Sequence, residues 1–282
     1  MVKDYIFVSD YFSEEIQGGG ELNDDELIKC LSKKNNITKV KSVNVNIDFL
    51  KQNKEKNIII SNFIFLPQQS KFFLEQNCNY VLYEHDHKYL STRNPASYPN
   101  FLAPKESIIN RSFYKNARSV FCQSSFHEEM IFKNLNLNNI ENLSGNMWSD
   151  IALGLLEKYL IKEKRNKYSI MQSPINHKNT NASVLFCKYK SYNYELIKPL
   201  DYHNFLDKIS NNQALVFFPK TPETLSRIVV ECRMMGMKVI TNNLVGATYE
   251  PWFTKKGKDL ISLMKERKDI IIKKVQGSFA ND

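Results

Sequence analysis

The sequence predicts an α/β protein built from two Rossmann-like domains. Short apolar runs of strand length alternate with helix-like segments along most of the chain, a pattern typical of parallel sheets covered by helices. The length of 282 residues is a second indication, because it suffices for two domains that each bury a core of their own. A third is the charged run Lys162-Glu163-Lys164-Arg165-Asn166-Lys167, which separates the two halves.

Residues 1–148 are expected to form the first domain, on the acceptor side. Its strand-like runs lie at 5–8, 43–47, 58–60, 80–83 and 119–123. Ser149-Asp150 is a helix start, and the apolar stretch 151–161 then leads into the charged run. Residues 149–167 are therefore expected to form a connector helix between the domains.

Residues 168–257 are expected to form the second domain. We predict strands at 168–172, 195–197, 215–218 and 239–240, with helices between them. In the first of these helices, apolar residues recur at helical spacing: Ala182, Leu185, Phe186 and Tyr189. The remaining residues, 258–282, predict a basic amphipathic helix that could pack back on the first domain.

The composition favours a globular protein, with 42% hydrophobic and 12% aromatic residues. Its five cysteines are scattered and never form a C-x-x-C pair, so neither a disulfide framework nor a zinc site is indicated. The chain begins with a strand-like run and not with a long apolar segment, and we expect a cytoplasmic protein.

A net charge of +9 permits an anionic partner. The lysines are spread along the chain, which favours a compositional bias over a nucleic-acid site. Nucleic acid is therefore a partner that we do not favour. The basic residues between 255 and 274 surround apolar ones, so that helix could also make a weak contact with a membrane surface, although such a helix more often packs on the protein body.

Two glutamates separated by seven residues, Glu223 and Glu231, carry the clearest functional signal. They follow the apolar run 214–219 and precede Gly236 and another strand-like run, so the segment predicts strand, loop, helix and strand. With both glutamates at the ends of two helical turns, their separation would be about 12 Å. The loop would offer backbone N–H groups at a helix N-terminus to a phosphate or a sugar.

These residues resemble the E-x7-E element of retaining glycosyltransferases of the GT-B type, the group 1 superfamily. The resemblance is clearest over 168–250 and implies two Rossmann-like domains facing across a cleft. It further implies that Glu223 contacts hydroxyls of the donor sugar and that Glu231 contacts the nucleotide ribose. The donor phosphate would be held by the loop between strand and helix, which contains Thr221, Pro222 and Thr224.

The same resemblance implies a basic residue after the first strand of the second domain, pairing with the donor diphosphate. Lys178 is the best match, but the usual earlier arginine is absent, which leaves Lys178 or Lys220 to carry the charge. The implied reaction moves a sugar from a UDP- or GDP-sugar to a hydroxyl of a glycan or another acceptor. It is expected to retain configuration and to need no obligatory cofactor or metal, and no D-x-D motif is present.

A glycine run, Gly18-Gly19-Gly20, lies between the first strand and the first helix. Such a turn lets backbone approach a ligand closely. In relatives a similar loop lies beside the donor diphosphate or the acceptor, so Gly19 and Gly20 are candidate ligand contacts. The run matches neither G-x-G-x-x-G nor the Walker pattern.

Tyr83-Glu84-His85-Asp86-His87-Lys88 closes a strand of the first domain. Alternation along an extended chain would place His85 and His87 on one face, and the resemblance implies that one of them contacts the donor sugar. Imidazole and carboxylate could instead bind a metal or serve a structural role. The polar loop that follows contains Arg93, which could bind an acidic or phosphorylated acceptor.

Three other functions remain as alternatives. The charge permits a glycosyltransferase that modifies DNA. The His85-Asp86-His87 cluster permits a metal-dependent phosphohydrolase. A non-catalytic protein could also keep the fold to bind glycans or nucleotides.

Overall fold

The computed structural model describes residues 2–280, which divide into two compact units. Unit 1 comprises the residues up to Met147 together with those from Arg267 onward, and unit 2 comprises Trp148–Glu266. Each unit is an α/β body with its own sheet and its own cores. None of the helices in residues 2–280 is both long and apolar enough to cross a membrane.

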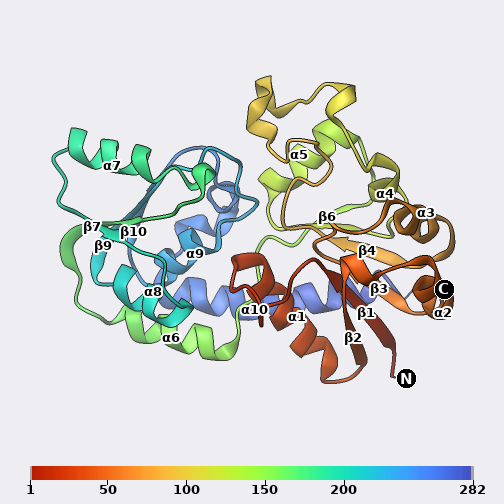
Figure 1. Cartoon of the computed structure of the whole chain (residues 1–282). Coiled ribbons are helices and arrows are strands. Elements are labelled where there is room, and N and C mark those ends of the chain that lie inside the picture. The colour runs from red at the N-terminus through yellow and green to blue at the C-terminus, as the bar shows by residue number, and fades with distance from the viewer. Residues whose placement is uncertain (1, 281–282) are drawn as a thin grey trace. The chain divides into compact units, whose positions relative to one another are not determined.

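The sheet of unit 1 is entirely parallel and has the strand order β2-β1-β3-β4-β5-β6 (Figure 1). Its strands are β1 (Asp4–Ser9), β2 (Asn36–Lys41), β3 (Asn57–Ile60), β4 (Tyr80–Tyr83), β5 (Val120–Cys122) and β6 (Ile140–Asn142). Its helices are α1 (Gly19–Ser32), α2 (Ile47–Asn53), α3 (Gln68–Asn77), α4 (Arg111–Lys115) and α5 (Ser125–Leu135).

The sheet of unit 2 is also parallel, with the order β10-β9-β7-β8. Its strands are β7 (Arg165–Met171), β8 (Tyr194–Ile197), β9 (Asn212–Phe217) and β10 (Lys238–Thr241). Its helices are α6 (Asp150–Leu160), α7 (Thr180–Tyr189), α8 (Tyr202–Ile209) and α9 (Arg227–Met234). The long helix α10 (Gly257–Gly277) begins in unit 2 and ends in unit 1.

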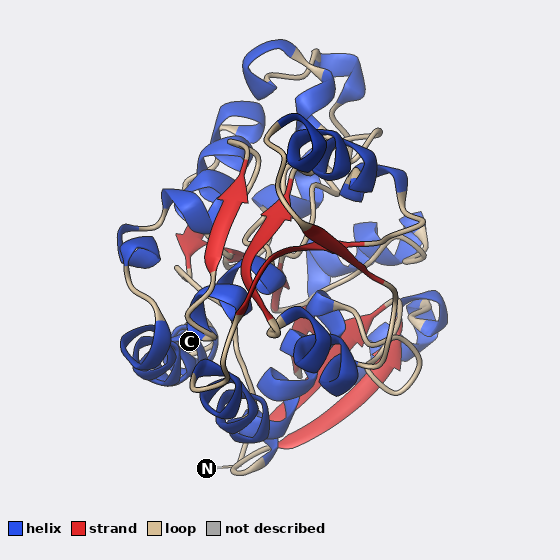
Figure 2. Cartoon of the chain, turned by 90° about the vertical axis from the view of Figure 1, so that its left-hand side faces the viewer, coloured by secondary structure: helices blue, strands red, loops and turns tan. Residues whose placement is uncertain are grey.

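Both faces of the unit 1 sheet are buried, which explains why its central strands are continuously apolar. Along β1, Ile6 and Val8 belong to one core cluster, whereas Tyr5 and Phe7 belong to the other. Helices α2, α3, α4 and α5 contribute side chains to the first cluster, and α1 and α10 contribute to the second. Helices accordingly lie on both faces of the unit 1 sheet. Figure 2 shows the strands of the chain with helices around them.

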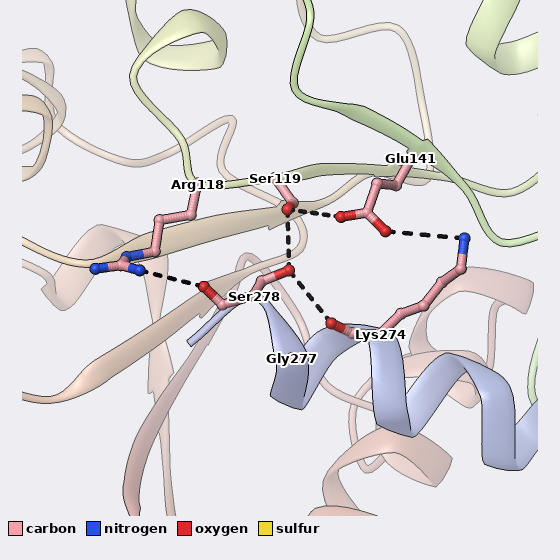
Figure 3. Close-up of a pocket in the computed structure, with 6 residues that line it drawn as sticks. All are labelled: Arg118, Ser119, Glu141, Lys274, Gly277 and Ser278. Carbon is pink, nitrogen blue, oxygen red and sulfur yellow. Dashed lines mark hydrogen bonds and ion pairs between the residues drawn. The ribbon is translucent and has the colours of Figure 1, made fainter. Parts of the chain in front are cut away.

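The last turns of α10 are fixed to the amino end of β5 and to β6 (Figure 3). Ser278 Oγ lies 2.9 Å from Ser119 Oγ, and Lys274 Nζ donates to the carbonyl of Asn142 at 2.8 Å. Ser119 Oγ in turn donates to Glu141 at 2.9 Å. These polar groups line a cavity of about 490 Å³ but satisfy one another, so they act as a clamp on the end of the helix.

The structure confirms the α/β class with parallel sheets and most of the predicted strands. The strand predicted at 43–47 is wrong, because Ser42–Asn44 is a 3-10 turn and the Asn46 side chain caps α2 by accepting from Phe49 N at 2.9 Å. The neighbouring strand is β2, a partly exposed edge strand that carries no apolar run. The other edge strand, β6, was not predicted either, because it is only three residues long.

The segment expected to connect the domains, residues 149–167, lies entirely within unit 2. Leu153 and Leu156 of α6 are buried in the core of that unit, and β7 starts at Arg165, inside the predicted charged run. The buried face of α7 also differs from the predicted one. Leu185 and Tyr189 are 65% and 81% exposed, whereas Ser183 and Cys187 are buried.

We predict that Ile271→Ala lowers the stability of the protein by about 2–4 kcal/mol, because it leaves a cavity in a packed core. Ile271 is fully buried among residues of α1 and of the unit 1 sheet. Ile270 is 39% exposed, and Ile270→Ala is the matched control, expected to cost less than about 1 kcal/mol. Urea unfolding of both variants measures the difference, and equal losses would contradict this packing of α10.

Candidate functional site

Apart from Glu231, which lies on α9, the candidate residues of unit 2 lie in loops at the carboxyl ends of its strands. One loop follows β7 and carries Lys178, and the other follows β9 and carries Glu223. Because all strands of the sheet are parallel, these ends meet at the same edge, where ligands bind in open α/β sheets. Residues 45 positions apart in sequence therefore come into contact.

Lys178 and Glu223 form an ion pair, with 2.7 Å between Nζ and Oε1. The two loops are also joined through backbone, because Lys220 N donates to the carbonyl of His177 at 2.8 Å. Asn179 adopts a left-handed conformation, with φ of 54°, and its amide donates to the carbonyl of Phe218 at 3.0 Å. The pair is accessible, since 26% of the Lys178 side chain and 16% of the Glu223 side chain are exposed.

Glu223 lies in extended backbone and not on the helix. Its N–H donates to Leu244 at 2.8 Å and its carbonyl accepts from Gly246 N at 2.9 Å, which forms a parallel bridge to Val245. The helix α9 begins only at Arg227, after Ser226 turns the chain with φ of 73°. The prediction that both glutamates end two helical turns is therefore wrong, and so is the spacing derived from it.

Glu231 is buried on α9 and ties this helix to Tyr202 of α8 and to Trp148, which lies just before α6. Its Oε1 accepts from Trp148 Nε1 at 2.9 Å, from Tyr202 OH at 2.7 Å and from Arg227 Nε at 2.8 Å. The Arg227 guanidinium lies 4.6 Å from the centre of the Trp148 ring, a cation–π geometry. All three of these donors bind the same oxygen, Oε1. Burial raises the pKa of Tyr202, and the negative charge of Glu231 raises it further. The Tyr202 hydroxyl therefore stays protonated and acts as a donor.

The loop between β9 and α9 contains the other candidates. Lys220 does not join the ion pair, because its Nζ donates to Asn176 Oδ1 at 3.1 Å. Thr221, Pro222 and Thr224 precede the first helical N–H groups, and Thr224 is buried. Sequence reasoning missed Ser226. Its hydroxyl is buried and forms no hydrogen bond with any residue between 2 and 280. A serine directly before a helix was the available signal.

In unit 1, His85 is the centre of a polar chain at the carboxyl edge of the sheet. Its Nε2 lies 2.5 Å from Asp24 Oδ1, and Ser61 Oγ donates to the second Asp24 oxygen at 2.6 Å. Its Nδ1 contacts the Gln123 amide. Asp24, Ser61 and Gln123 were not predicted, although Ser61 and Gln123 each follow directly after a buried strand.

The glycine run lies beside this histidine. Gly19 is the first residue of α1, and a Cβ at Gly20 would lie 3.5 Å from the His85 ring. The close approach is therefore between Gly20 and the imidazole. Whether either glycine contacts a ligand stays a prediction.

The chain bends at His85 and Asp86 and is not an extended strand there, so the alternation that was predicted to pair His85 with His87 does not apply. The strand itself ends at Tyr83. His87 is buried, with Nδ1 3.2 Å from Tyr89 OH and its ring 5.2 Å from that of His127. It is therefore a core histidine of unit 1.

Asp86 forms an ion pair with Arg93. Arg93 Nε donates to its Oδ2 at 2.6 Å. Burial raises the pKa of Asp86, but the charges of Lys88, His87 and Arg93 outweigh this effect and hold the pKa at about 2. The three side chains of the His85-Asp86-His87 cluster thus have separate partners. Within residues 2–280, no group of three or more His, Cys, Asp or Glu side chains is arranged to hold a metal ion.

No model of a protein family matches the chain, and no curated protein matches its sequence. Among solved structures, Anabaena Alr3699/HepE in complex with UDP and glucose matches with a TM-score of 0.57 at 11% identity, over 95% of this chain and 90% of that chain. Its complex with UDP-glucose gives a TM-score of 0.55 at 11% identity, over 97% and 93%.

The lipopolysaccharide outer core galactosyltransferase WaaB, in its apo form, matches with a TM-score of 0.50 at 11% identity, over 96% of this chain and 91% of that chain. At such low identity these likenesses report on the fold alone. Together with the two parallel sheets, they confirm the predicted GT-B fold.

We predict that the stability of the protein falls as pH drops below about 6.5, partly through His127. Its Nε2 lies 3.1 Å from the Asp86 carbonyl and its Nδ1 accepts from Gln123 N at 3.4 Å. Burial, followed by the charge of His87, holds the pKa of His127 well below its usual value. Below about pH 6.5 the unfolded chain therefore binds a proton that the folded protein does not. The free energy of unfolding then falls by up to about 1.4 kcal/mol for each pH unit.

His127→Gln should reduce this pH dependence, whereas His203→Gln, at an exposed position, should leave it unchanged. Urea unfolding between about pH 5 and 7 measures the slope. An unaltered slope in His127→Gln would show that this histidine is not held neutral.

We also predict that the two glutamates of the E-x7-E element differ in their contribution to stability. Glu231→Gln takes away the buried carboxylate opposite Arg227 and should cost about 2–4 kcal/mol. Glu223→Gln breaks a partly exposed pair and should cost less than about 1 kcal/mol. Denaturant unfolding of both variants provides the comparison, and similar costs would contradict the assigned environments.

Proposed function

We propose that the protein is a glycosyltransferase that transfers a sugar from a nucleotide-sugar donor to a hydroxyl acceptor. The observation that carries the proposal is the Lys178–Glu223 ion pair at the carboxyl edge of the unit 2 sheet, beside the start of α9. The GT-B fold supports it, as do the UDP and UDP-glucose complexes of HepE and the galactosyltransferase WaaB. A UDP-sugar is therefore the first donor to test, and a GDP-sugar the second.

Lys178 would bind the diphosphate of the donor. Its ammonium can neutralise negative charge that develops on the leaving nucleoside diphosphate, which lowers the barrier because the interaction is stronger in the transition state than in the ground state. The Ser226 hydroxyl and the N–H groups at the start of α9 would supply further donors to the phosphates. Lys220, Thr221, Pro222 and Thr224 would complete this loop around the diphosphate.

Glu223 would bind hydroxyls of the donor sugar. In the present structure Lys178 occupies one of its oxygens, and a partly exposed ion pair contributes only about 0–1 kcal/mol. A donor can therefore replace the pair at small cost, with phosphate taking over Lys178 and sugar hydroxyls taking over Glu223. The pair keeps both groups oriented until the donor binds.

Glu231 would contact the ribose through Oε2. Its Oε1 is held by Trp148, Tyr202 and Arg227, which fixes the carboxylate rigidly. A rigid acceptor favours binding because little conformational freedom is lost when the ligand arrives. This role is compatible with the structural one, since each uses a different oxygen.

His85 is the candidate for the sugar contact from unit 1, with Gly19 and Gly20 beside it. Asp24 and Gln123 orient its ring, so a ligand would have to displace the Gln123 amide or bind at the ring face. We assign no role at the donor site to His87. The inferred reaction retains the configuration of the sugar and uses no metal ion. The departing phosphate helps to deprotonate the acceptor hydroxyl, and no residue acts as a nucleophile. We further propose that the donor carries a hexose and that the protein is cytoplasmic.

The test is the binding of UDP-, GDP-, ADP- and CMP-sugars, with and without magnesium, measured by thermal shift and calorimetry. We predict that one nucleotide class raises the melting temperature, because a ligand that binds only the folded state stabilises it. Lys178→Met should weaken that binding about tenfold or more, since a charge-assisted contact is lost. Glu223→Gln should weaken binding of the nucleotide sugar more than binding of the free nucleotide.

Lys188→Met is the matched control, because Lys188 is exposed in the last turn of α7, the helix that begins just after Lys178. It should bind donors as the unaltered protein does. Binding without any turnover over a broad acceptor panel would instead identify a non-catalytic nucleotide-sugar binder. Absence of binding to every donor, in a folded sample, would reject the proposal.

A further inference from the structure

A second cavity, of about 560 Å³, lies in unit 1 at the carboxyl edge of its sheet. The loops that follow β3 and β4 form its walls, and Asp10 fixes the first of these loops by accepting from Ile64 N at 2.8 Å and Phe65 N at 3.1 Å. The side chains that line it combine basic and apolar groups: Phe63, Ile64, Lys71, Lys88, Arg93 and Ile109. The cavity belongs to unit 1 alone.

Lys71 is the unusual member of this cavity, because it is buried without a carboxylate partner. The residue is only 8% exposed. Its Nζ donates to Asn110 Oδ1 at 3.2 Å and lies 5.3 Å from the centre of the Phe63 ring. No carboxylate among residues 2–280 lies within ion-pair distance of it. Burial lowers the pKa of Lys71, and Asp10 and Glu75 oppose this only from a distance.

The position of Lys71 on α3 adds a second cost. It is the fourth residue of the helix, which begins at Gln68, and the N-cap residue Pro67 supplies no side-chain cap. The positive end of the helix dipole disfavours a cation at this turn and favours an anion. Gln68, the first residue of the helix, also lines the cavity. An anion in the cavity would therefore relieve both unfavourable terms.

The other two cations of the cavity are already compensated. Lys88 forms a buried ion pair with Glu84, and Arg93 pairs with Asp86. One positive charge, that of Lys71, remains for a ligand. The apolar side chains Phe63, Ile64 and Ile109 provide a surface for the C–H face of a sugar ring, next to the place where its anionic group would lie.

We propose that this cavity binds the anionic group, carboxylate or phosphate, of an acidic sugar that serves as acceptor. The acceptor role rests on the proposed function, whereas the anion site itself does not. Lys71 would form the principal contact with the anion. The first N–H groups of α3 would assist it.

The experiment uses the full chain without donor and measures binding of glucuronate, glucose 6-phosphate and glucose by calorimetry. Binding of either acid, with glucose at least about tenfold weaker, supports the proposal, and the two acids distinguish carboxylate from phosphate recognition. Lys71→Met should abolish this difference. Lys51→Met, at an exposed position on α2, should not. Equal binding of glucose and both acids, or no binding of any, would overturn it.

Thermal stability without ligand gives an independent readout. Lys71→Met should melt at a higher temperature than the unaltered protein, because it removes an uncompensated buried charge and keeps the volume. A purely structural lysine, held by Asn110, would instead give a lower melting temperature. The variant should bind nucleotide sugars as the unaltered protein does, so loss of the anion site can be told apart from failure of the donor site.

Discussion

The parallel pairing of all strands in both sheets is the constraint on which the candidate sites depend. Parallel strands require crossover connections, so every strand ends at the same edge as its neighbours, and the loops that leave those ends are gathered there. Lys178 and Glu223 meet in unit 2 for this reason, and Asp24, Ser61, His85 and Gln123 meet in unit 1 for the same reason. Each set comes from segments that are distant in sequence.

The two glutamates of the E-x7-E element have different physical environments. Glu231 is buried, accepts three hydrogen bonds on one oxygen and ties α9 to the helices before it. Glu223 is partly exposed and is held by backbone bonds, while its carboxylate has only an exchangeable lysine partner. A rigid carboxylate suits a ribose that is bound in one way. An exchangeable ion pair suits a site whose charge has to be taken up by a diphosphate.

The sequence was sufficient to predict the α/β class, the central strands and the two loops of unit 2 that carry Lys178 and Glu223. Central strands are buried on both faces and therefore read as apolar runs, whereas the edge strand β2 is polar and β6 is short, so neither could be recognised from hydrophobicity. The predicted helical spacing of Glu223 and Glu231 was wrong because Ser226 adopts a left-handed conformation that sequence periodicity does not reveal. Contacts such as Asp24 with His85, or Lys71 with Asn110, depend on the tertiary fold and have no local signal.

A crystal structure of the protein with the nucleoside diphosphate that stabilises it most tests the central claim most directly. The account predicts that the Lys178–Glu223 ion pair is broken, with Lys178 Nζ on a phosphate oxygen, Ser226 within hydrogen-bond distance of the diphosphate and Glu231 Oε2 on the ribose. An intact Lys178–Glu223 pair, with the nucleotide bound elsewhere, would contradict it.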